Sequence, residues 1–453
     1  MSERTPNSEL RTPNLNRLTG LLLDWFAANA RDLPWRRTRD PYAIWVSEIM
    51  LQQTQVKTVI PYWECWMREL PDIRALAKAS PAKIHKLWEG LGYYTRVRNL
   101  QKAARQIVAQ RDSDAETRTS RGNEPQTNSK LETPHVVSGK FPDRFDDVLA
   151  LPGIGRYTAG AICSIAFNQP TPILDGNVIR VLTRIFGIGG NPREKKTNAR
   201  LWQLAEGLVI HASRFAHHAS RHGSRTGNED KKTPACSHLN QSLMELGALI
   251  CTPRSPQCEI CPVKKYCVAC RENRTGQLPN LDKRAAATTR HFVALVVEQK
   301  GRFLVRQRPA GVINAHLWEF PNVEIASRNG GNGRESAHSS RKQRLSRLTS
   351  AATVREADPE IIRAAMGLGI VSPALQPLGT VKHSITRYRI TLEAFHVHLG
   401  GRSSKPPKLL GTRSAHPPEN GVWRTPAQLN RLAFASAHKK LASLAAGCIL
   451  SGR

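Results

Sequence analysis

Apolar residues recur at helical spacing through the first half of the chain. The spacing predicts helices over residues 18–28, 43–60, 81–89 and 95–110, with Glu48 at the margin of the apolar face of the second one. This periodicity predicts that the first part of the chain folds as helices packed on helices.

The helical pattern breaks at a turn from Gly153 to Gly155, between a short helix predicted over 145–150 and another over 156–167. Two close glycines between helices are typical of a helix-hairpin-helix, in which the backbone can approach a ligand closely. The free N–H groups at the start of the second helix could bind one phosphate of a nucleic-acid backbone. Any tight helical hairpin also needs glycine, so the turn alone favours DNA binding no more than ordinary packing.

After about residue 290 the pattern changes to runs rich in β-branched residues. Residues 292–298 and 303–307 predict a β-hairpin with a short turn, and further strands are expected near 385–398 and a final helix near 436–446. The predicted fold class is therefore multidomain, with an all-α domain followed by an α+β domain.

The predicted parts are a disordered tail over 1–16, an all-α domain over 17–270, a linker over 271–290 and an α+β domain over 291–453. Three polar segments, rich in Ser, Thr, Asn, Arg and Gly, lack apolar periodicity and cannot bury a core. We expect them to be exposed and mostly disordered inserts, at about 111–139, 217–234 and 326–357.

Lysine and arginine number 67 against 36 aspartates and glutamates, a formal net charge of +31. This excess favours a polyanionic partner, either nucleic acid or an anionic membrane surface. The chain has no apolar run long enough to cross a bilayer and a polar start without a signal peptide's apolar core. We therefore expect a soluble intracellular protein.

Four of the nine cysteines form the pattern C-x6-C-x2-C-x5-C, at Cys251, Cys258, Cys261 and Cys267. In a reducing compartment such a cluster favours a metal site over disulfides. Four thiolates can hold either zinc or an iron-sulfur cluster. The nearby Cys270 is not expected to be a ligand.

The segment LPGIGRYTAGAI followed by LDGNVIRVLTR resembles the helix-hairpin-helix DNA glycosylases of the endonuclease III superfamily, and within them the adenine DNA glycosylases of MutY type. The resemblance covers residues 18–267 and, more loosely, 291 to the end. It implies base excision repair of adenine mispaired with 8-oxoguanine or guanine in double-stranded DNA, by a monomer in the bacterial cytoplasm at the nucleoid. It also implies that the cysteine spacing is a 4Fe-4S loop.

Cleavage of a bond between base and sugar passes through an oxocarbenium-like state and typically uses two carboxyl groups. Glu48 and Asp175 lie in the segments SEIMLQQTQV and LDGNV, which match the family's catalytic segments. Glu48, partly desolvated, would be the acid. Asp175, at a helix start where the dipole favours its ionised form, would oppose the cation, with Asn177 orienting the site.

Residue 157 distinguishes reaction types. Bifunctional relatives carry a lysine there that attacks the sugar, whereas this chain has Tyr157. Without that amine we expect a monofunctional glycosylase, which does not cut the strand.

Further residues match family positions that contact DNA or the flipped base. Gln53 and Tyr93 match residues that wedge into the duplex near the opposing base. The expected adenine pocket includes Trp35, Arg36 and Glu245.

The C-terminal domain resembles a Nudix (MutT-like) fold through RQRPAGVINAHLWEFPN. The metal-binding helix of a Nudix hydrolase does not follow, so we expect no nucleotide hydrolysis. The family reads 8-oxoguanine through a loop usually written FSH. Here that triplet is Ile385-Thr386-Arg387, and Thr386 keeps a hydroxyl for this contact.

Two rival functions remain from the sequence. One is an endonuclease III-like glycosylase and AP lyase for oxidised pyrimidines, which Tyr157 and the Nudix-like domain oppose. The other is a noncatalytic DNA-binding or redox-sensing iron-sulfur protein, which the presence of both Glu48 and Asp175 opposes.

Overall fold

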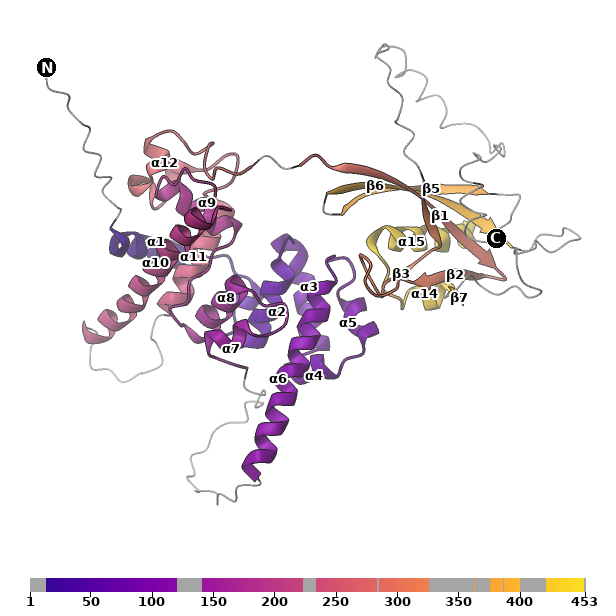
Figure 1. Cartoon of the computed structure of the whole chain (residues 1–453), viewed down its shortest axis with the longest axis horizontal. Helices are drawn as coiled ribbons and strands as arrows, with labels where there is room; N and C mark the ends of the chain where they lie inside the picture. Colours follow the sequence, from indigo (N-terminus) through magenta and orange to yellow (C-terminus); the bar gives the residue numbers. More distant parts are fainter. Residues whose placement is uncertain are drawn as a thin grey trace, which may run out of the picture. The chain divides into compact units, whose positions relative to one another are not determined.

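The computed structural model describes residues 14–119, 141–222, 234–282, 285–325, 362, 375–385, 387–399 and 421–451 (Figure 1). The chain divides into two compact units. The helical unit comprises Met1–Ala79 and Arg96–Lys283, and the sheet unit comprises Ser80–Thr95 and Arg284–Arg453. Residues 80–95, predicted as part of the first domain, group in space with the second.

The helical unit is built from helices joined by short loops, as its apolar periodicity predicts. They are α1 (Leu15–Asn29), α2 (Pro41–Leu51), α3 (Val56–Glu69), α4 (Ile73–Lys78), α6 (Thr95–Thr119), α7 (Phe145–Leu149), α8 (Arg156–Phe167), α9 (Gly176–Ile185), α10 (Lys195–His222), α11 (Ala235–Leu249) and α12 (Val268–Arg271). Short 3-10 turns η1, η2 and η3 lie at Pro34–Arg36, Cys258–Ile260 and Lys264–Tyr266. Helices α6 and α10 run into the first two predicted inserts, whose remainders lie outside the described residues.

The single helix predicted over 43–60 is wrong, because the chain breaks it into α2 and α3. At the break, Gln53 adopts a left-handed conformation with φ 58°. The Nη1 of Arg96 donates to the carbonyl oxygens at the end of α2, at 2.8 Å from Ile49 and 2.5 Å from Gln52. These bonds satisfy carbonyls that a continuing helix would otherwise use, so the helix can end there.

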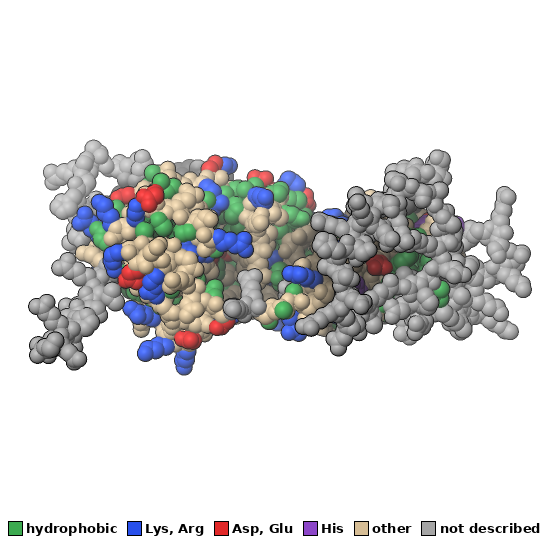
Figure 2. All heavy atoms as spheres, turned by 90° about the horizontal axis from the view of Figure 1, so that it is seen from above, with side chains coloured by type: hydrophobic (Ala, Val, Ile, Leu, Met, Phe, Trp, Pro, Cys, Tyr) green, Lys and Arg blue, Asp and Glu red, His purple; other side chains and the backbone are tan. Residues whose placement is uncertain are grey.

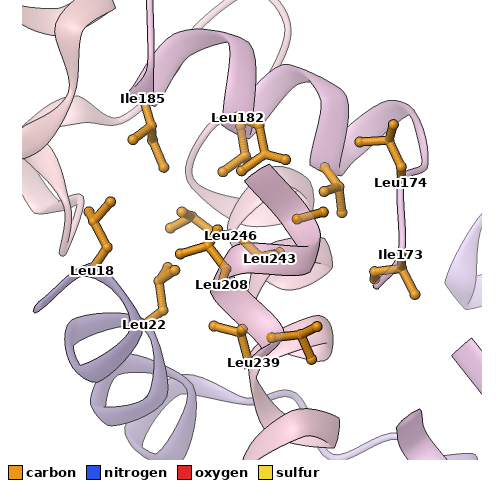
Figure 3. Close-up of a cluster of buried hydrophobic side chains, with 14 of the residues drawn as sticks. Leu18, Leu22, Ile173, Leu174, Leu182, Ile185, Leu208, Leu239, Leu243 and Leu246 are labelled. Carbon is orange, nitrogen blue, oxygen red and sulfur yellow. The ribbon is translucent and has the colours of Figure 1, made fainter. Parts of the chain in front are cut away.

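A core of aliphatic side chains holds α9 in place (Figure 3). Figure 3 shows side chains from α1, α9, α10 and α11 meeting those of the segment before α9. The labelled members are Leu18, Leu22, Ile173, Leu174, Leu182, Ile185, Leu208, Leu239, Leu243 and Leu246. Since Ile173 and Leu174 immediately precede Asp175, this core fixes the start of α9.

Two glycines allow backbone segments to approach closely around the start of α9. A Cβ on Gly160 would lie 2.2 Å from the carbonyl oxygen of Pro172, and one on Gly247 would lie 2.7 Å from Cβ of Asn177. The amide of Asn240 donates to the carbonyl of Thr171 at 2.8 Å and holds the same segment from α11. The loop leading to Asp175 is therefore clasped between α8 and α11.

The sheet unit contains a mixed sheet in the order β3-β2-β1-β6-β5, with β4 paired to β1 and β7 to β2. The strands are β1 (Thr288–Gln299), β2 (Arg302–Gln307), β3 (Trp318–Glu319), β4 (Asn322–Ile325), β5 (Gln376–Ile385), β6 (Tyr388–His398) and β7 (Gly421–Arg424). Helices α5 (Pro81–Leu87), α14 (Pro426–Leu429) and α15 (Ser436–Ser451) belong to the same unit.

The predicted hairpin is present as antiparallel β1 and β2. The segment predicted near 385–398 forms β6, which pairs with β5 in a second hairpin and runs parallel to β1. Alternate residues of β1 face opposite cores: Ala294 and Val296 pack in the core that includes Leu441 of α15, while Val293 and Leu295 pack on the other face. The third predicted insert lies outside the described residues.

The clasp at Gly160 can be tested by adding one methyl group. Gly160→Ala forces the new Cβ against the Pro172 backbone, and overpacking of this kind costs about 1–3 kcal/mol. We expect a lower free energy of unfolding in urea titrations. Gly276→Ala is the matched control, because a Cβ there meets nothing within 4 Å. A Gly160→Ala protein as stable as wild type would contradict the clasp.

Candidate active site and cluster loop

A cavity of about 560 Å³ opens in the helical unit where η1, α2, α8, α9 and α11 meet. This cavity is lined by eight of the residues predicted from the sequence: Trp35, Arg36, Glu48, Gln53, Tyr157, Asp175, Asn177 and Glu245. The remaining predicted residues lie elsewhere. Tyr93 is in the sheet unit, Gly153 and Gly155 form the hairpin turn, and Thr386 lies outside the described residues.

Glu48 is deeply buried on α2, with 5% of its surface exposed. Its Oε2 accepts a hydrogen bond from the hydroxyl of Tyr157 at 2.9 Å. Burial raises the pKa of Glu48 to about 7, and the nearby Asp175 charge adds to the rise, while the Tyr157 bond and Arg36 oppose it. A carboxyl with this pKa is protonated for a large fraction of the time near neutral pH.

Asp175 is the N-cap of α9, and its Oδ1 accepts from the backbone N–H of Val178 at 2.7 Å. Its Oδ2 accepts from Asn177 Nδ2 at 3.1 Å. The N–H groups at the helix start favour the ionised form of Asp175, in the direction expected from the sequence. Desolvation by burial has the larger effect and raises the pKa, although these hydrogen bonds and the charge of Arg180 favour the ionised form.

Glu245 on α11 is a buried carboxylate of the opposite kind. Arg31 binds both of its oxygens at 2.7 Å, and Arg36 binds them at 3.2 and 3.0 Å. Burial opposes ionisation, but these arginine bonds prevail and lower the pKa of Glu245 to about 2. Arg36 also donates to Gln241 at 2.9 Å, so this charge network forms a rigid cavity wall.

The predicted DNA-facing residues are exposed or occupy turns. Gln53 is exposed, and its left-handed backbone lies between α2 and α3. Gly153 has φ 79° and lies against Asn99, whereas a Cβ on Gly155 would meet nothing within 4 Å. Gly155 is the N-cap of α8, so open space adjoins the first turn of that helix.

Trp35 is buried beside Trp63, with ring centroids 6.1 Å apart. The cavity residues that were not predicted include Arg31, Gln241 and Met244. The sulfur of Met244 lies 3.2 Å from the Tyr157 hydroxyl. The segment LMELGALIC contains Met244 beside the predicted Glu245, but no spacing rule identifies it. Arg31 and Glu245 are 214 positions apart, so nothing local indicates their pairing.

The four predicted cysteine ligands line a second cavity, bounded by α9, α11 and the loop that follows α11. Cys270 lines it too. Arg184 of α9, 1% exposed, donates from Nη1 to Cys251 Sγ at 3.3 Å and to the carbonyl of Thr252 at 2.7 Å. A buried arginine directed at a thiol and at the loop backbone suits sulfur ligands that carry negative charge.

The cysteine donors fit a multi-atom cluster better than a single ion. Among the described residues, no three His, Cys, Asp or Glu side chains gather closely enough to hold one metal ion. Zinc would need such a tight set, with Zn–S distances of about 2.3 Å. Four thiols spread around one cavity instead match the wider reach of an iron-sulfur cube.

Neighbouring arginines of α9 join the two cavities. Arg180 donates to Asn177 Oδ1 at 2.8 Å, to the carbonyl of Gly247 at 2.6 Å and to that of Cys251 at 2.7 Å. One turn later, Arg184 holds the beginning of the cysteine loop. The helix that begins at Asp175 therefore also anchors the cluster loop.

One face of the helical unit shows how its basic side chains are distributed. Figure 2 shows Lys and Arg side chains distributed over this unit on the face seen from above, not gathered in one patch. No helix in the described part of the chain is long and apolar enough to cross a membrane.

Three family models match the chain. Residues 46–206 match the HhH-GPD superfamily base excision DNA repair protein, residues 251–267 the iron-sulfur binding domain of endonuclease III, and residues 292–444 the NUDIX domain. The fold is thus a helix-hairpin-helix glycosylase domain followed by a Nudix-like domain, and the chain carries a 4Fe-4S cluster.

Curated proteins match over most of the chain. The adenine DNA glycosylase of Rattus norvegicus is 32% identical over 93% of this chain and 76% of its own length. That of Buchnera aphidicola subsp. Schizaphis graminum is 34% identical over 67% and 74%. Among solved structures, a thermostable thymine-DNA glycosylase is 26% identical with a TM-score of 0.43, covering 57% of this chain and 97% of that one.

The raised pKa of Glu48 predicts a gain in stability on Glu48→Gln. Below pH 4.5 the carboxyl is protonated in both states, and as pH rises to about 7 the unfolded chain ionises first, so the fold loses stability. The shift corresponds to roughly 3 kcal/mol. At pH 8, urea titrations should show Glu48→Gln more stable than wild type, with a much smaller gain at pH 5.

Glu245→Gln is the matched control, for which we expect a change in stability of the opposite sign. It removes the charge that binds Arg31 and Arg36, so it should destabilise the protein at pH 8. A Glu48→Gln protein that is no more stable than wild type at pH 8 would contradict the desolvation of Glu48.

The cluster loop predicts a metal content that can be measured directly. Anaerobically prepared protein should contain about four iron atoms per chain and absorb broadly in the visible range. Cys258→Ser should lose iron, whereas Cys65→Ser, on α3 outside the loop, should keep it. Stoichiometric zinc without iron would refute the assignment.

Proposed function

The chain belongs to the adenine DNA glycosylase family, and we propose that it hydrolyses the N-glycosidic bond of adenine mispaired with 8-oxoguanine or guanine. It is a DNA glycosylase of base excision repair. Glu48 supports this specific chemistry most strongly. It is a buried carboxyl in the main cavity, hydrogen-bonded to a neutral hydroxyl, and its pKa is about 7.

In the proposed reaction Glu48 donates a proton to the leaving base. When the bond breaks, the base keeps the bonding electrons and would leave with a negative charge. A carboxyl that is protonated near neutral pH can donate the proton that neutralises this charge. Asp175, lining the same cavity, carries the negative charge that stabilises the sugar cation until water adds to it, loses a proton and completes the hydrolysis. Its bonds to Val178 and Asn177 hold the carboxylate in one orientation.

Tyr157 is proposed to make the enzyme monofunctional. Its hydroxyl is bonded to Glu48 and its pKa is raised well above the usual value by burial and by the two carboxylates, so it stays protonated. A neutral phenol does not form the Schiff base through which relatives with lysine at this position cut the strand. The endonuclease III-like alternative is disfavoured on this ground, and the Nudix-like domain also opposes it.

The cavity wall is proposed to receive the flipped adenine. Trp35, Arg36 and Glu245 offer one aromatic ring and a fixed set of hydrogen-bonding groups. The rigidity of the arginine-carboxylate network suits recognition, because the pocket needs little rearrangement to bind a base.

Other residues are proposed to hold the duplex. Gln53 would fill the gap left by the base, and Tyr93 would insert beside the opposing base. The open space at Gly155, together with Gly153, would admit a backbone phosphate to the start of α8. Thr386, outside the described residues, remains the predicted contact for 8-oxoguanine.

Cys251, Cys258, Cys261 and Cys267 are the proposed ligands of the 4Fe-4S cluster. With all four positions taken by thiolates, the cluster would stabilise the loop or carry electrons. We further propose that the protein acts as a monomer on double-stranded DNA at the nucleoid of a bacterium, and that its Nudix-like domain does not hydrolyse nucleotides.

One gel assay tests the proposed function. A duplex with a central adenine opposite 8-oxoguanine should lose the adenine yet stay intact until alkali is added, and borohydride should trap little covalent complex. Glu48→Gln and Asp175→Asn should lose excision by several orders of magnitude. Tyr157→Lys should gain trapping and some strand cutting.

The matched control is Tyr157→Phe, which removes the bond to Glu48 without adding an amine. It should alter the excision rate but never trap. If the wild type cuts the strand as fast as it releases adenine, the monofunctional assignment is wrong, and excision of oxidised pyrimidines instead would identify the endonuclease III-like alternative.

A further inference from the structure

The turn that carries Tyr93 has an unusual backbone. Gly90, Gly92 and Tyr93 all have positive φ values, of 112°, 72° and 48°. Tyr93 is 43% exposed, while its neighbours Trp88 and Tyr94 are buried. A non-glycine residue in this region needs support from its surroundings, so contacts must hold the turn in shape.

Glu89, which directly precedes this turn, is buried and fully bonded within the sheet unit. Its Oε1 accepts from the backbone N–H of Phe434 at 2.9 Å, and its Oε2 accepts from Lys439 Nζ and Lys86 Nζ, each at 2.8 Å. Its side chain is 3% exposed. The lysine and backbone bonds outweigh desolvation and lower its pKa, so the carboxylate is ionised.

These bonds tie the turn to the central part of the Nudix-like fold. Phe434 is bridged to Trp318 of β3, where Trp318 N–H donates to the carbonyl of Ala433 at 2.9 Å. Lys86 also donates to the carbonyl of Leu432 at 3.0 Å. Glu89 and Lys86 are therefore bonded to the segment that leads into α15, at Leu432 and Phe434, and Glu89 also to Lys439 in α15 itself.

Further contacts hold the two flanks of the turn. The ring of His85 stacks on that of His316 with centroids 6.4 Å apart and planes at 20°. Trp88 Nε1 donates to the carbonyl of Gly92 at 3.0 Å, across the turn. Because both flanks are held, the sheet unit sets the direction of Tyr93. This is so even though residues 80–95 lie inside the HhH-GPD match.

We propose that Glu89 is a positioning residue for the wedge Tyr93, and that through Glu89 the Nudix-like fold and Tyr93 act on the mispair as one rigid body. The inference rests on the proposed function, in which Tyr93 enters the duplex beside the opposing base. It follows that breaking the Glu89 bonds releases Tyr93 without touching the carboxylates that carry out the chemistry.

The test measures adenine excision by full-length protein from duplexes with adenine opposite 8-oxoguanine or guanine, under limiting and saturating enzyme. Glu89→Gln should weaken binding and excision by about tenfold at limiting enzyme, because a misplaced group loses its contribution. At saturating enzyme, single-turnover rates opposite 8-oxoguanine should change much less. The preference for 8-oxoguanine over guanine should also change.

A double mutant separates positioning from general stability. If Glu89 acts through Tyr93, then Glu89→Gln combined with Tyr93→Ala should be no worse than Tyr93→Ala alone. Lys439→Gln, whose side chain is 52% exposed and which removes one of the three bonds, should give a smaller effect in the same direction. If Glu89→Gln does not fold, Lys439→Gln is the variant that tests the proposal.

Glu324→Gln is the matched control, because Glu324 is a carboxylate of the same unit that pairs with Arg290. It should leave excision unchanged. Additive effects of Glu89→Gln and Tyr93→Ala, or normal excision in both Glu89→Gln and Lys439→Gln, would overturn the inference alone. A wild type that releases no adenine from either duplex would overturn the proposed function instead.

Discussion

The cost of burying a carboxylate is the constraint on which the site depends. A carboxylate removed from water must find cations and hydrogen bonds, or it becomes protonated. The described part of the chain buries four glutamates, and three of them are bound by cations: Glu89 by two lysines, Glu245 by two arginines and Glu319 by Arg306 and Arg308. In all three the pKa is lowered. Glu48 is bonded to a tyrosine instead, and its pKa rises to about 7. Because no bonded cation offsets its burial, this one glutamate of the four can stay protonated near neutral pH.

Helix α9 connects that chemistry to the cluster loop. Asp175 caps its first turn, Arg180 holds Asn177 and the carbonyl of Cys251, and Arg184 holds the loop from within the core. A shift of the cysteine loop would therefore move the start of the helix that bears the second carboxylate. Because α9 packs in the aliphatic core, the proposed roles of Asp175 and of the cluster loop are linked through the position of this one helix.

The sequence allowed prediction of features that depend on local spacing or on a family motif. Helix α8, the hairpin glycines, the β1–β2 hairpin and eight of the residues lining the main cavity belong to this group. It did not allow prediction of features set by distant partners. The helix over 43–60 was expected to continue because its apolar spacing continues, but Arg96, more than 40 positions away, bonds to its carbonyls and ends it. The helix start that favours the ionised form of Asp175 is visible in the sequence, whereas the burial that raises its pKa depends on the whole fold.

Residues 80–95 illustrate the same limit at the scale of domains. The periodicity of this segment is that of the helices around it, and the family model includes it in the first domain. Its position depends on distant partners, since the buried Glu89 binds groups about 350 positions later in the chain. Removing residues 80–95 would leave the buried N–H of Phe434 without its acceptor, and an unpaired buried donor is costly. The Nudix-like fold is therefore completed by a segment from the first part of the chain, so cutting between the two predicted domains would damage the second of them.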